Sequence, residues 1–364
     1  MSRPVLRLAL EIDGEGGHPA AWRRALHPPG ALLTGRRLVS VARAAEAAGF
    51  PLVTLDDTLV PPGEGTDVVG RLGAVERAAY IAASTSLVGV VATVSTTYVE
   101  PSSLASQLAS VDHLSLGRAG WLVSTERDAD AARTWGLVRV RGEANLRQEA
   151  RDVVQVVRDL WDSWEDGAVV RDAATGRYLD RERVHYVDFE GTTFSVKGPS
   201  ITPRPPQGQL VVMAPAHLAD VVRPDIVLVD GPTPADAATA ARVARAPLAF
   251  AELDVALDTD EATAVERRAD LEFHAPWPEH GRLRHTGSAD GLVRLLSELA
   301  PEVAGVRIHP LVLDEDLPVL AGRVVPALVG AGIAHRPLPG ASLRGLLGLP
   351  RPASRFAALR SEPS

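Results

Sequence analysis

The sequence predicts an α/β fold, a closed (β/α)8 TIM barrel with insertions, on three observations. Short apolar runs rich in β-branched residues recur along the 364 residues, and longer Ala-, Arg- and Glu-rich stretches of helical periodicity separate them. The runs number eight, which favours a closed barrel over an open doubly wound sheet, the alternative. Barrels of this length commonly form a single domain.

The eight expected strands share the apolar, β-branched character of buried parallel strands. They are Val5 to Glu11, Leu52 to Asp56, Ser86 to Val94, Ala119 to Ser124, Leu210 to Ala214, Ile226 to Asp230, Leu248 to Leu257 and Val306 to Leu313.

Two of the intervening helices carry clear signals. Leu38 to Ala48 is followed by Gly49, the residue type that most often ends a helix. Glu149 to Trp164 places Val153 and Val157 on one apolar face. Both segments are therefore expected to cover the barrel wall.

One domain is expected over residues 1–350, with a C-terminal tail at residues 351–364. The widest gap between strands, at about residues 125–209, contains a polar stretch from Asp166 to Pro206 rich in Asp, Arg, Gly and Pro. That stretch is typical of an excursion packed outside a barrel.

Composition excludes several kinds of chemistry. The formal net charge of −8 and the lack of Lys/Arg clusters interleaved with aromatic residues exclude nucleic acid as a partner. The absence of cysteine excludes disulfides, thiolate metal sites and cysteine nucleophiles. His274, His280 and His285 lack the spacing of metal ligands, so no metal site is expected.

The chain is expected to be cytoplasmic, with no membrane association. The apolar run at its start reaches Glu11 and Asp13 too soon for a signal sequence, and no stretch approaches the roughly 18 apolar residues of a membrane span.

Several segments carry a family resemblance that spans nearly the whole chain. They are HPAAWR (18–23), ATVSTTYVE (92–100), SVDHLSLGRAGW (110–121), LWDSWEDG (160–167), the stretch from YLDRERVHYVDFEG to SVKGP with the following RPPQG turn (204–208), and SLRGLLGLP (342–350). Together they resemble the nitrilotriacetate and dibenzothiophene-sulfone monooxygenase group of the luciferase-like flavin monooxygenase superfamily.

The resemblance implies a parallel barrel whose strand C-termini bind reduced FMN, which then oxygenates a small organic substrate. A separate flavin reductase would supply the electrons. The sequence agrees on this point, because the glycines at Gly14 to Gly17 and Gly63 to Gly70 lack the G-x-G-x-x-G spacing of a built-in dinucleotide site.

Five residues fall at positions where the resemblance implies site contacts. Asp57, Thr93, Ser95 and Ser124 follow or end expected strands and match flavin contacts, and His18 matches a histidine near the substrate cavity. Simpler explanations also exist: a capping or turn residue for Asp57, Thr93 and Ser95, and a solvated loop residue for His18.

The family pattern breaks at the flavin-facing positions. The amide expected after the fourth strand is replaced by Leu122. The Gly-Ser-Ser turn expected after the fifth strand is replaced by Pro215, Ala216 and His217. Proline removes an amide donor and alanine a hydroxyl, and His217 compensates at most in part.

A further departure lies on the helix that follows, where the family places His and Tyr four residues apart. Here the positions are Glu143 and Arg147, on one helical face. Arg147 could grip the flavin phosphate in place of the lost donors, with Glu143 opposing it, or the two could form an ordinary ion pair with each other. Both remain candidate cofactor residues with Ala216 and His217.

Three functional hypotheses follow. The first is a two-component, reduced-FMN-dependent monooxygenase with an altered phosphate site. The second changes the cofactor to the deazaflavin F420, with hydride transfer. The third is a flavin-free, degenerate barrel that acts as a partner subunit or ligand-binding protein. The resemblance also implies a homodimer, through helices such as Leu72 to Ala83.

Overall fold

The computed structural model describes residues 5–60 and 70–356. In this part of the chain eight parallel strands close into a ring, since β1 pairs with β2 and β13 while β10 pairs with β11. The predicted closed barrel is confirmed and the open sheet is wrong. In ring order the strands are β1 (Arg7–Glu11), β2 (Leu52–Leu55), β3 (Gly89–Ser95), β4 (Ala119–Ser124), β9 (Val211–Pro215), β10 (Ile226–Val229), β11 (Leu248–Leu257) and β13 (Gly305–Pro310).

A ninth parallel strand, β12 (Leu283–Gly287), was not predicted. It pairs with the second half of β11, beyond the point where β11 leaves β10. Its sequence LRHTG has one buried apolar side chain, Leu283, so it lacks the continuous apolar run of the ring strands. Its pairing depends on the unusual length of β11, which only the fold reveals.

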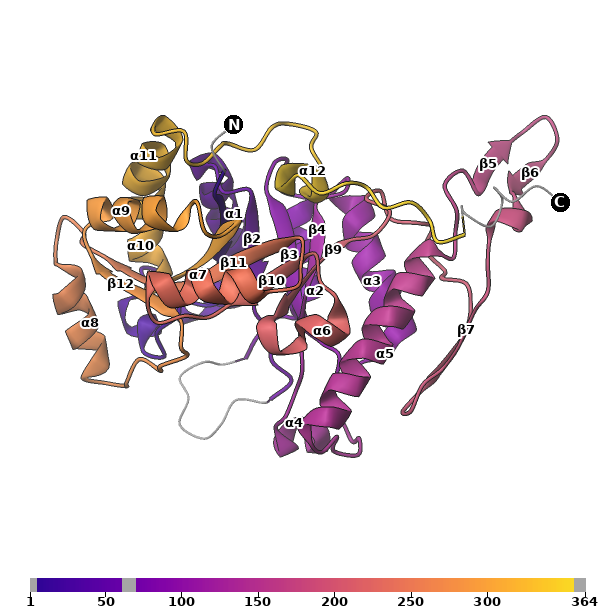
Figure 1. Cartoon of the computed structure of the whole chain (residues 1–364), viewed down its shortest axis with the longest axis horizontal. Helices are drawn as coiled ribbons and strands as arrows, with labels where there is room; N and C mark the ends of the chain where they lie inside the picture. The colour runs from indigo at the N-terminus through magenta and orange to yellow at the C-terminus, as the bar shows by residue number, and fades with distance from the viewer. Residues whose placement is uncertain (1–4, 61–69, 357–364) are drawn as a thin grey trace.

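Helices surround the ring (Figure 1). The two predicted ones are α1 (Gly35–Ala48), which ends at Gly49 in the left-handed conformation with φ of 101°, and α5 (Glu143–Asp162), which begins six positions earlier than expected. The others are η1 (Ala21–Arg24), η2 (Pro29–Leu33), α2 (Ala74–Ala82), α3 (Pro101–Leu114), α4 (Ala129–Thr134), η3 (Arg181–Arg183), η4 (Ala216–Leu218), α6 (Ala219–Val222), α7 (Pro234–Val243), α8 (Ala264–Glu272), α9 (Ala289–Leu299), α10 (Leu313–Val319), the π-helical η5 (Leu320–Val324), α11 (Val325–Gly330) and α12 (Leu343–Leu347). No helix of the described chain combines the length and apolar character needed to cross a bilayer.

The long gap between β4 and β9 contains α4, α5 and two small antiparallel hairpins. The hairpins pair β5 (Val169–Asp172) with β6 (Arg177–Leu179) and β7 (Val187–Glu190) with β8 (Ser195–Gly198), apart from the barrel sheet. Figure 1 shows them beyond α5. The single-domain assignment stays a prediction, and residues 357–364 of the expected tail lie outside the described residues.

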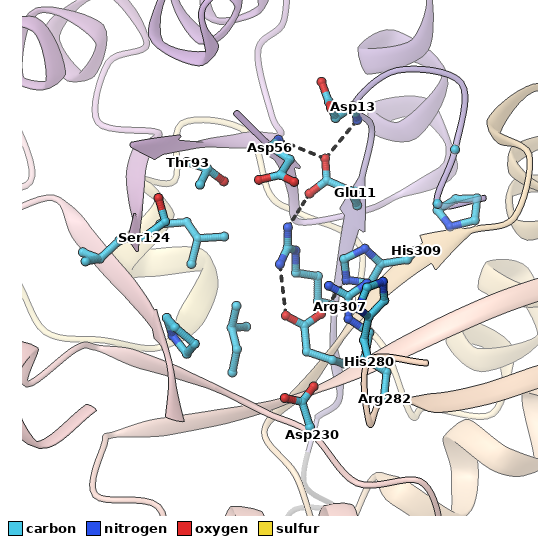
Figure 2. A pocket seen from close by; sticks show the side chains of 18 of the residues that line it. Glu11, Asp13, Asp56, Thr93, Ser124, Asp230, His280, Arg282, Arg307 and His309 are labelled. Atoms are coloured by element: carbon cyan, nitrogen blue, oxygen red, sulfur yellow. Dashed lines mark hydrogen bonds and ion pairs between the residues drawn. The ribbon is translucent and has the colours of Figure 1, made fainter. Parts of the chain in front are cut away.

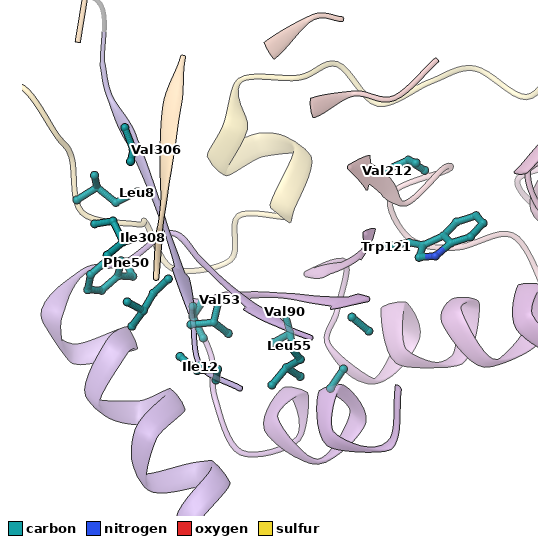
Figure 3. Packing of buried hydrophobic residues seen from close by; sticks show 14 of the residues in the cluster. Leu8, Ile12, Phe50, Val53, Leu55, Val90, Trp121, Val212, Val306 and Ile308 are labelled. Carbon is teal, nitrogen blue, oxygen red and sulfur yellow. The ribbon is translucent and has the colours of Figure 1, made fainter. Parts of the chain in front are cut away.

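Alternation along each ring strand divides the core into two layers. On β1, Leu8 and Leu10 join the cluster between barrel and helices, which Figure 3 shows packed against the outer wall, whereas Ala9 belongs to a separate cluster inside the ring. The same alternation sends Trp121 outward and Leu122 inward on β4. It therefore decides which side chains can line an internal cavity.

The amino-terminal end of the barrel is closed by α12. Its Leu343 and Leu347 pack inside the ring against residues such as Val91 and Phe250. A Cβ added to Gly120 would lie 3.1 Å from Leu343, so glycine permits this close approach. The inner core thus fills one end of the barrel and leaves the carboxyl end to the polar inward-facing side chains.

Candidate functional site

A cavity of about 590 Å³ lies at the carboxyl ends of the ring strands. Every ring strand, or the turn directly after it, contributes a lining residue: Glu11, Asp56, Thr93, Leu122, Pro215, Leu228, Glu252 and Arg307, joined among others by Asp13, Arg71, Ser124, Asp230, His280, Arg282 and His309. Figure 2 shows these side chains converging from opposite walls. This is the end of a TIM barrel where active sites form, and the volume suits a small-molecule ligand.

The floor of the cavity is a buried ionic network centred on Arg307. Its guanidinium donates to Thr54 Oγ1 at 2.9 Å, to Glu252 Oε1 at 3.0 Å and to Glu11 Oε2. His309 Nε2 lies 2.5 Å from the second oxygen of Glu252. Four charged or titratable side chains inside the barrel thereby satisfy one another, as burial requires.

Electrostatics keep this network ionised. Burial opposes the charge on Glu252 and Glu11, but the positive charge of Arg307 and the hydrogen bonds that the two carboxylates accept outweigh it and lower the pKa of both carboxyls. Burial lowers the pKa of His309 and favours the neutral imidazole. Arg307 therefore supplies the permanent positive charge of the floor.

Two lining carboxylates, Asp56 and Asp230, have no ion pair within the described part of the chain. Restricted solvation raises the pKa of each, and a neighbouring carboxylate adds to the rise: Glu11 for Asp56 and Glu252 for Asp230. The walls above the floor thus carry two carboxyl groups without a direct ion pair, and the charges of Arg307 and Arg282 only partly offset the rise in their pKa values.

Thr93 and Ser124, both predicted, lie together in the cavity lining. Thr93 is 3% exposed and its Oγ1 is buried without a hydrogen-bond partner. A buried hydroxyl left unpaired costs free energy that a ligand can recover. These two residues are the polar contacts available to a flat ring system, with Leu122 and Leu228 as apolar contacts.

The structure places Asp57 and Ser95 outside the lining. Asp57 accepts from the backbone of Ala74, the first residue of α2, at 2.6 Å, and from Thr58 at 2.8 Å. The Oγ of Ser95 accepts from Thr97 N at 3.1 Å. Both side chains perform the capping and turn roles that were their alternatives, and their contact with a flavin stays a prediction.

Glu143 and Arg147 do not pair with each other, so the simple ion-pair interpretation is wrong. Arg147 Nη2 lies 2.6 Å from both oxygens of Asp220, and its Nη1 donates to the carbonyl of His217. Glu143 binds Arg127 at 2.7 Å. Each side chain instead takes a partner from another loop of the carboxyl rim.

Ala216 and His217 form η4, the short turn after β9. Both are exposed and neither is in the cavity lining, although Pro215 directly before them is. Partial burial and then the charge of Arg127 lower the pKa of His217, which favours its neutral form. The turn thus sits at the rim rather than inside the cavity.

His18 lies in a second, smaller cavity of about 240 Å³, which shares Asp13, Gly16 and Arg71 with the first. Its Nδ1 accepts from Ala20 N at 3.0 Å, which assigns the proton of the neutral ring to Nε2. That Nε2 is buried and unpaired, and burial lowers the pKa of the ring. His18 is therefore a neutral donor without a protein acceptor.

The sequence interpretation missed the floor network, although a signal for it exists. Glu252 stands in AFAELDVAL, and Arg307 and His309 alternate in GVRIHP. Charged residues spaced two apart inside a buried strand must face the barrel interior. His113, in the SVDHLSLGRAGW segment, lies outside the cavity lining, with its Nε2 3.3 Å from the carbonyl oxygen of Pro203.

One group of side chains has the spacing of a metal site. Atoms of Glu15, His27 and Asp314 lie within 4.8 Å of one another. The guanidinium of Arg37 also sits there, 2.5 Å from Asp314 and 3.9 Å from Glu15. Arg37 supplies the countercharge to the two carboxylates, so the cluster is an ion-pair group.

Comparison with known proteins agrees with this architecture. At the level of fold, the chain superposes on a crystal structure of riboflavin lyase with modified FMN and substrate riboflavin, with a TM-score of 0.82 and 23% identity over 98% of this chain and 100% of the other.

Sequence relatives include three named enzymes. N-acetyl-S-(2-succino)cysteine monooxygenase of Bacillus subtilis (strain 168) is 35% identical over 59% of this chain and 49% of its own length. Nitrilotriacetate monooxygenase component A of Aminobacter aminovorans is 33% identical over 57% and 49%. One of the subunits of pristinamycin IIA synthase from Streptomyces pristinaespiralis is 36% identical over 63% and 69%.

The chain spans about half the length of the first two of these relatives. The predicted resemblance to the nitrilotriacetate and dibenzothiophene-sulfone monooxygenase group is confirmed. The sequence pattern of the luciferase-like monooxygenases matches residues 16–276, most of the chain. The chain therefore belongs to the luciferase-like monooxygenase family.

Proposed function

We propose that the chain is the oxygenase of a two-component system that uses reduced flavin to oxygenate a small organic substrate. The observation that carries the proposal is the cavity of about 590 Å³ at the carboxyl rim, lined from every ring strand and holding the unpaired hydroxyl of Thr93. Reduced flavin, when bound, would supply the electrons and the reaction with oxygen.

The residues present fit the ring end of reduced FMN better than its phosphate end. Thr93 and Ser124 offer hydroxyls, and Leu122 and Leu228 offer an apolar wall. At the rim, Pro215 has no N–H and Arg147 is already bound to Asp220. The fit supports ring binding in the cavity, with FMN or a close flavin as the ligand.

The second cavity is the proposed substrate site. It adjoins the first through Asp13, Gly16 and Arg71, and its wall is largely apolar, with Trp22, Leu32, Leu33 and Leu72. The unpaired Nε2 of His18 would donate a hydrogen bond to a substrate oxygen and orient it. We keep His18 as the proposed catalytic contact.

The proposal extends to partners and organisation. A separate flavin reductase, a homodimer, a single barrel domain and a cytoplasmic location are all consistent with the family. The relatives named as monooxygenase components support the reductase. The lack of a bilayer-spanning helix among the described residues is consistent with the location.

A second candidate function is a non-catalytic subunit of a heteromeric oxygenase. The observation in its favour is the match to pristinamycin IIA synthase, the relative whose length is best covered among those named above, together with the altered rim. A second, separate polypeptide of that same synthase is also 35% identical to this chain. On this alternative the cavity would hold no flavin.

Anaerobic titration separates these functions. The full chain is titrated with reduced FMN, and separately with F420, while its tryptophan fluorescence is followed. Saturable binding of reduced FMN, weakened in Thr93→Val, supports the oxygenase. Binding of F420 but not of FMN would assign the chain to the deazaflavin-dependent enzymes. If neither cofactor binds at concentrations up to millimolar, both cofactor-dependent proposals are wrong and the non-catalytic role is favoured.

A further inference from the structure

We infer that this site recognises a flavin by its ring system and not by its phosphate, so that it accepts riboflavin about as well as FMN. The inference rests on the proposed function and names the cofactor class more narrowly. It follows from the ion pairs that the arginines of the carboxyl rim already form with carboxylates of the protein.

Five side chains form what we call the rim cluster: Arg127, Glu143, Arg147, His217 and Asp220. The cluster lies next to the cavity mouth, because Arg127 comes three residues after the lining residue Ser124, and His217 two after the lining residue Pro215. The charges of Arg127, Glu143 and Arg147, and that of the lining residue Asp230, all act on the His217 ring. A phosphate leaving the cavity on this side would meet these groups.

Both arginines of the rim cluster are already bound to carboxylates. Asp220 takes Arg147 in a two-pronged contact, with both oxygens 2.6 Å from Nη2, and the His217 carbonyl takes its Nη1. Glu143 takes Arg127 at 2.7 Å. The two guanidiniums and two carboxylates cancel, so the cluster offers a phosphate no net attraction.

The remaining donors of the rim cluster and of the turn after β9 do not replace them. Partial burial and the charge of Arg127 lower the pKa of His217 and favour the neutral ring. Pro215 has no N–H, Ala216 has no hydroxyl, and α6 is a helix of only four residues. A phosphate would have to displace Asp220 or Glu143, and this exchange of one anion for another returns little free energy.

The cavity itself is no more favourable to an anion. Arg71 pairs with Asp13 at 3.2 Å, Arg282 lies 3.4 Å from Asp254, and Arg307 is held by Glu11 and Glu252. Within the described lining, the carboxyls of Glu11, Asp13, Asp56, Asp230 and Glu252 outnumber the guanidiniums of Arg71, Arg282 and Arg307. Neither the rim cluster nor the cavity lining therefore attracts the phosphate.

The ring contacts are independent of this charge pattern. Thr93 Oγ1 is buried and unpaired, its β4 neighbour Leu122 is 5% exposed, and Leu228 on β10 is 5% exposed in the same lining. A flavin without the phosphate gains these contacts without the cost of bringing the phosphate charge to the rim. Riboflavin therefore retains most of the binding free energy of FMN.

The experiment compares matched ligands and matched variants. Full-length wild-type protein is titrated anaerobically with chemically reduced riboflavin and reduced FMN, and the two Kd values are expected to agree within about threefold. Asp220→Asn frees Arg147; because Asp220 is 65% exposed, the fold should tolerate the change. FMN should then bind about tenfold more tightly, while the Kd for riboflavin stays within about twofold.

Glu302→Gln is the control, because it removes the same charge and frees Arg242 on a distant helix end. It should change neither Kd. If the wild-type protein binds FMN about 100-fold more tightly than riboflavin, the inference is wrong but the proposed oxygenase function stands. If it binds neither flavin, both the inference and the proposed function are wrong. An FMN Kd that is unchanged in Asp220→Asn removes the electrostatic argument.

Discussion

Two buried polar networks at the amino-terminal end of the barrel, around Arg118 and Gln207, have several partners each, whereas two buried polar atoms at the carboxyl end have none. At the amino-terminal end, Arg118 donates to the carbonyls of Ser115, Val88, Ala82 and Thr85 at 2.6 to 3.1 Å. At the carboxyl end, Thr93 Oγ1 and His18 Nε2 are buried without a partner.

A second network strengthens the contrast. Gln207 donates to Asp112 Oδ1 at 2.6 Å and to the Ala119 carbonyl at 2.8 Å, and accepts from Arg344 N at 3.0 Å. These residues come from three of the segments that carried the family resemblance. The most recognisable segments therefore hold the closed end together, while the departures gather at the open end.

The difference teaches how to interpret unpaired groups here. A saturated network stabilises the fold, and breaking it leaves buried charge or polar atoms unpaired. An unpaired group has already incurred that cost, and a bound ligand can remove it. Removing a side chain from a network at the amino-terminal end should therefore lower the stability of the fold. Removing an unpaired group at the carboxyl end should not lower the stability but should weaken ligand binding.

The largest effect on stability is expected for Gln207→Leu. The change removes three hydrogen bonds and leaves Asp112, which is fully buried, with one partner fewer. The free energy of unfolding should fall by about 3 kcal/mol, measured by urea denaturation. Gln107→Leu, on the exposed face of the same helix as Asp112, should change it by less than about 0.5 kcal/mol. Equal losses in the two variants would show that the Gln207 network does not stabilise the amino-terminal end of the barrel.

A smaller effect should appear as a pH dependence from Asp112. Burial raises the pKa of Asp112 to about 6, even though hydrogen bonds from Gln207 and Ala119 favour the charged form. Because the folded chain holds this proton more tightly than the unfolded chain, whose Asp pKa is about 3.9, the contribution of Asp112 is complete below pH 4 and is lost as pH rises through 6.

The measurement is the difference in unfolding free energy between wild type and Asp112→Asn, taken from pH 4 to 7. It should decline by about 2 kcal/mol over that range, since the amide does not titrate. A carbon-13 carboxyl resonance that titrates near pH 4 instead of 6 would contradict the assignment.

Thr93→Val tests the open end. Valine has the shape of threonine without the unpaired hydroxyl, so stability should rise by up to about 1 kcal/mol while the Kd for reduced flavin increases about fivefold. Thermal unfolding and the anaerobic titration measure the two quantities. A loss of stability would mean that the hydroxyl has a partner in solution, and the contrast between the ends would weaken.

The smallest effect on stability is expected for Glu143→Gln. Its partner Arg127 is 59% exposed and the carboxylate 48% exposed, so solvent screens their attraction. The free energy of unfolding should change by less than about 0.5 kcal/mol, while reduced FMN binds more tightly because Arg127 is freed. A large loss of stability would show that the rim cluster supports the fold.

The sequence by itself determined the ring strands, the end of α1 and the family. The apolar runs located all eight ring strands, and Gly49 marked the end of α1, because these signals are local in the chain. Thr93 and Ser124 were also within reach, since strand ends of a parallel barrel converge on one rim.

Only the tertiary structure decided which charges meet. Arg147 is paired with a carboxylate 73 residues away, not with Glu143 four residues away on its own helix. Asp57 caps α2 instead of facing the cavity, and Arg307 joins acids from the first and seventh ring strands. Coulomb attraction depends on how far apart two charges lie in space. For residues in loops far apart in the sequence, that separation is set by the fold and cannot be inferred from sequence spacing.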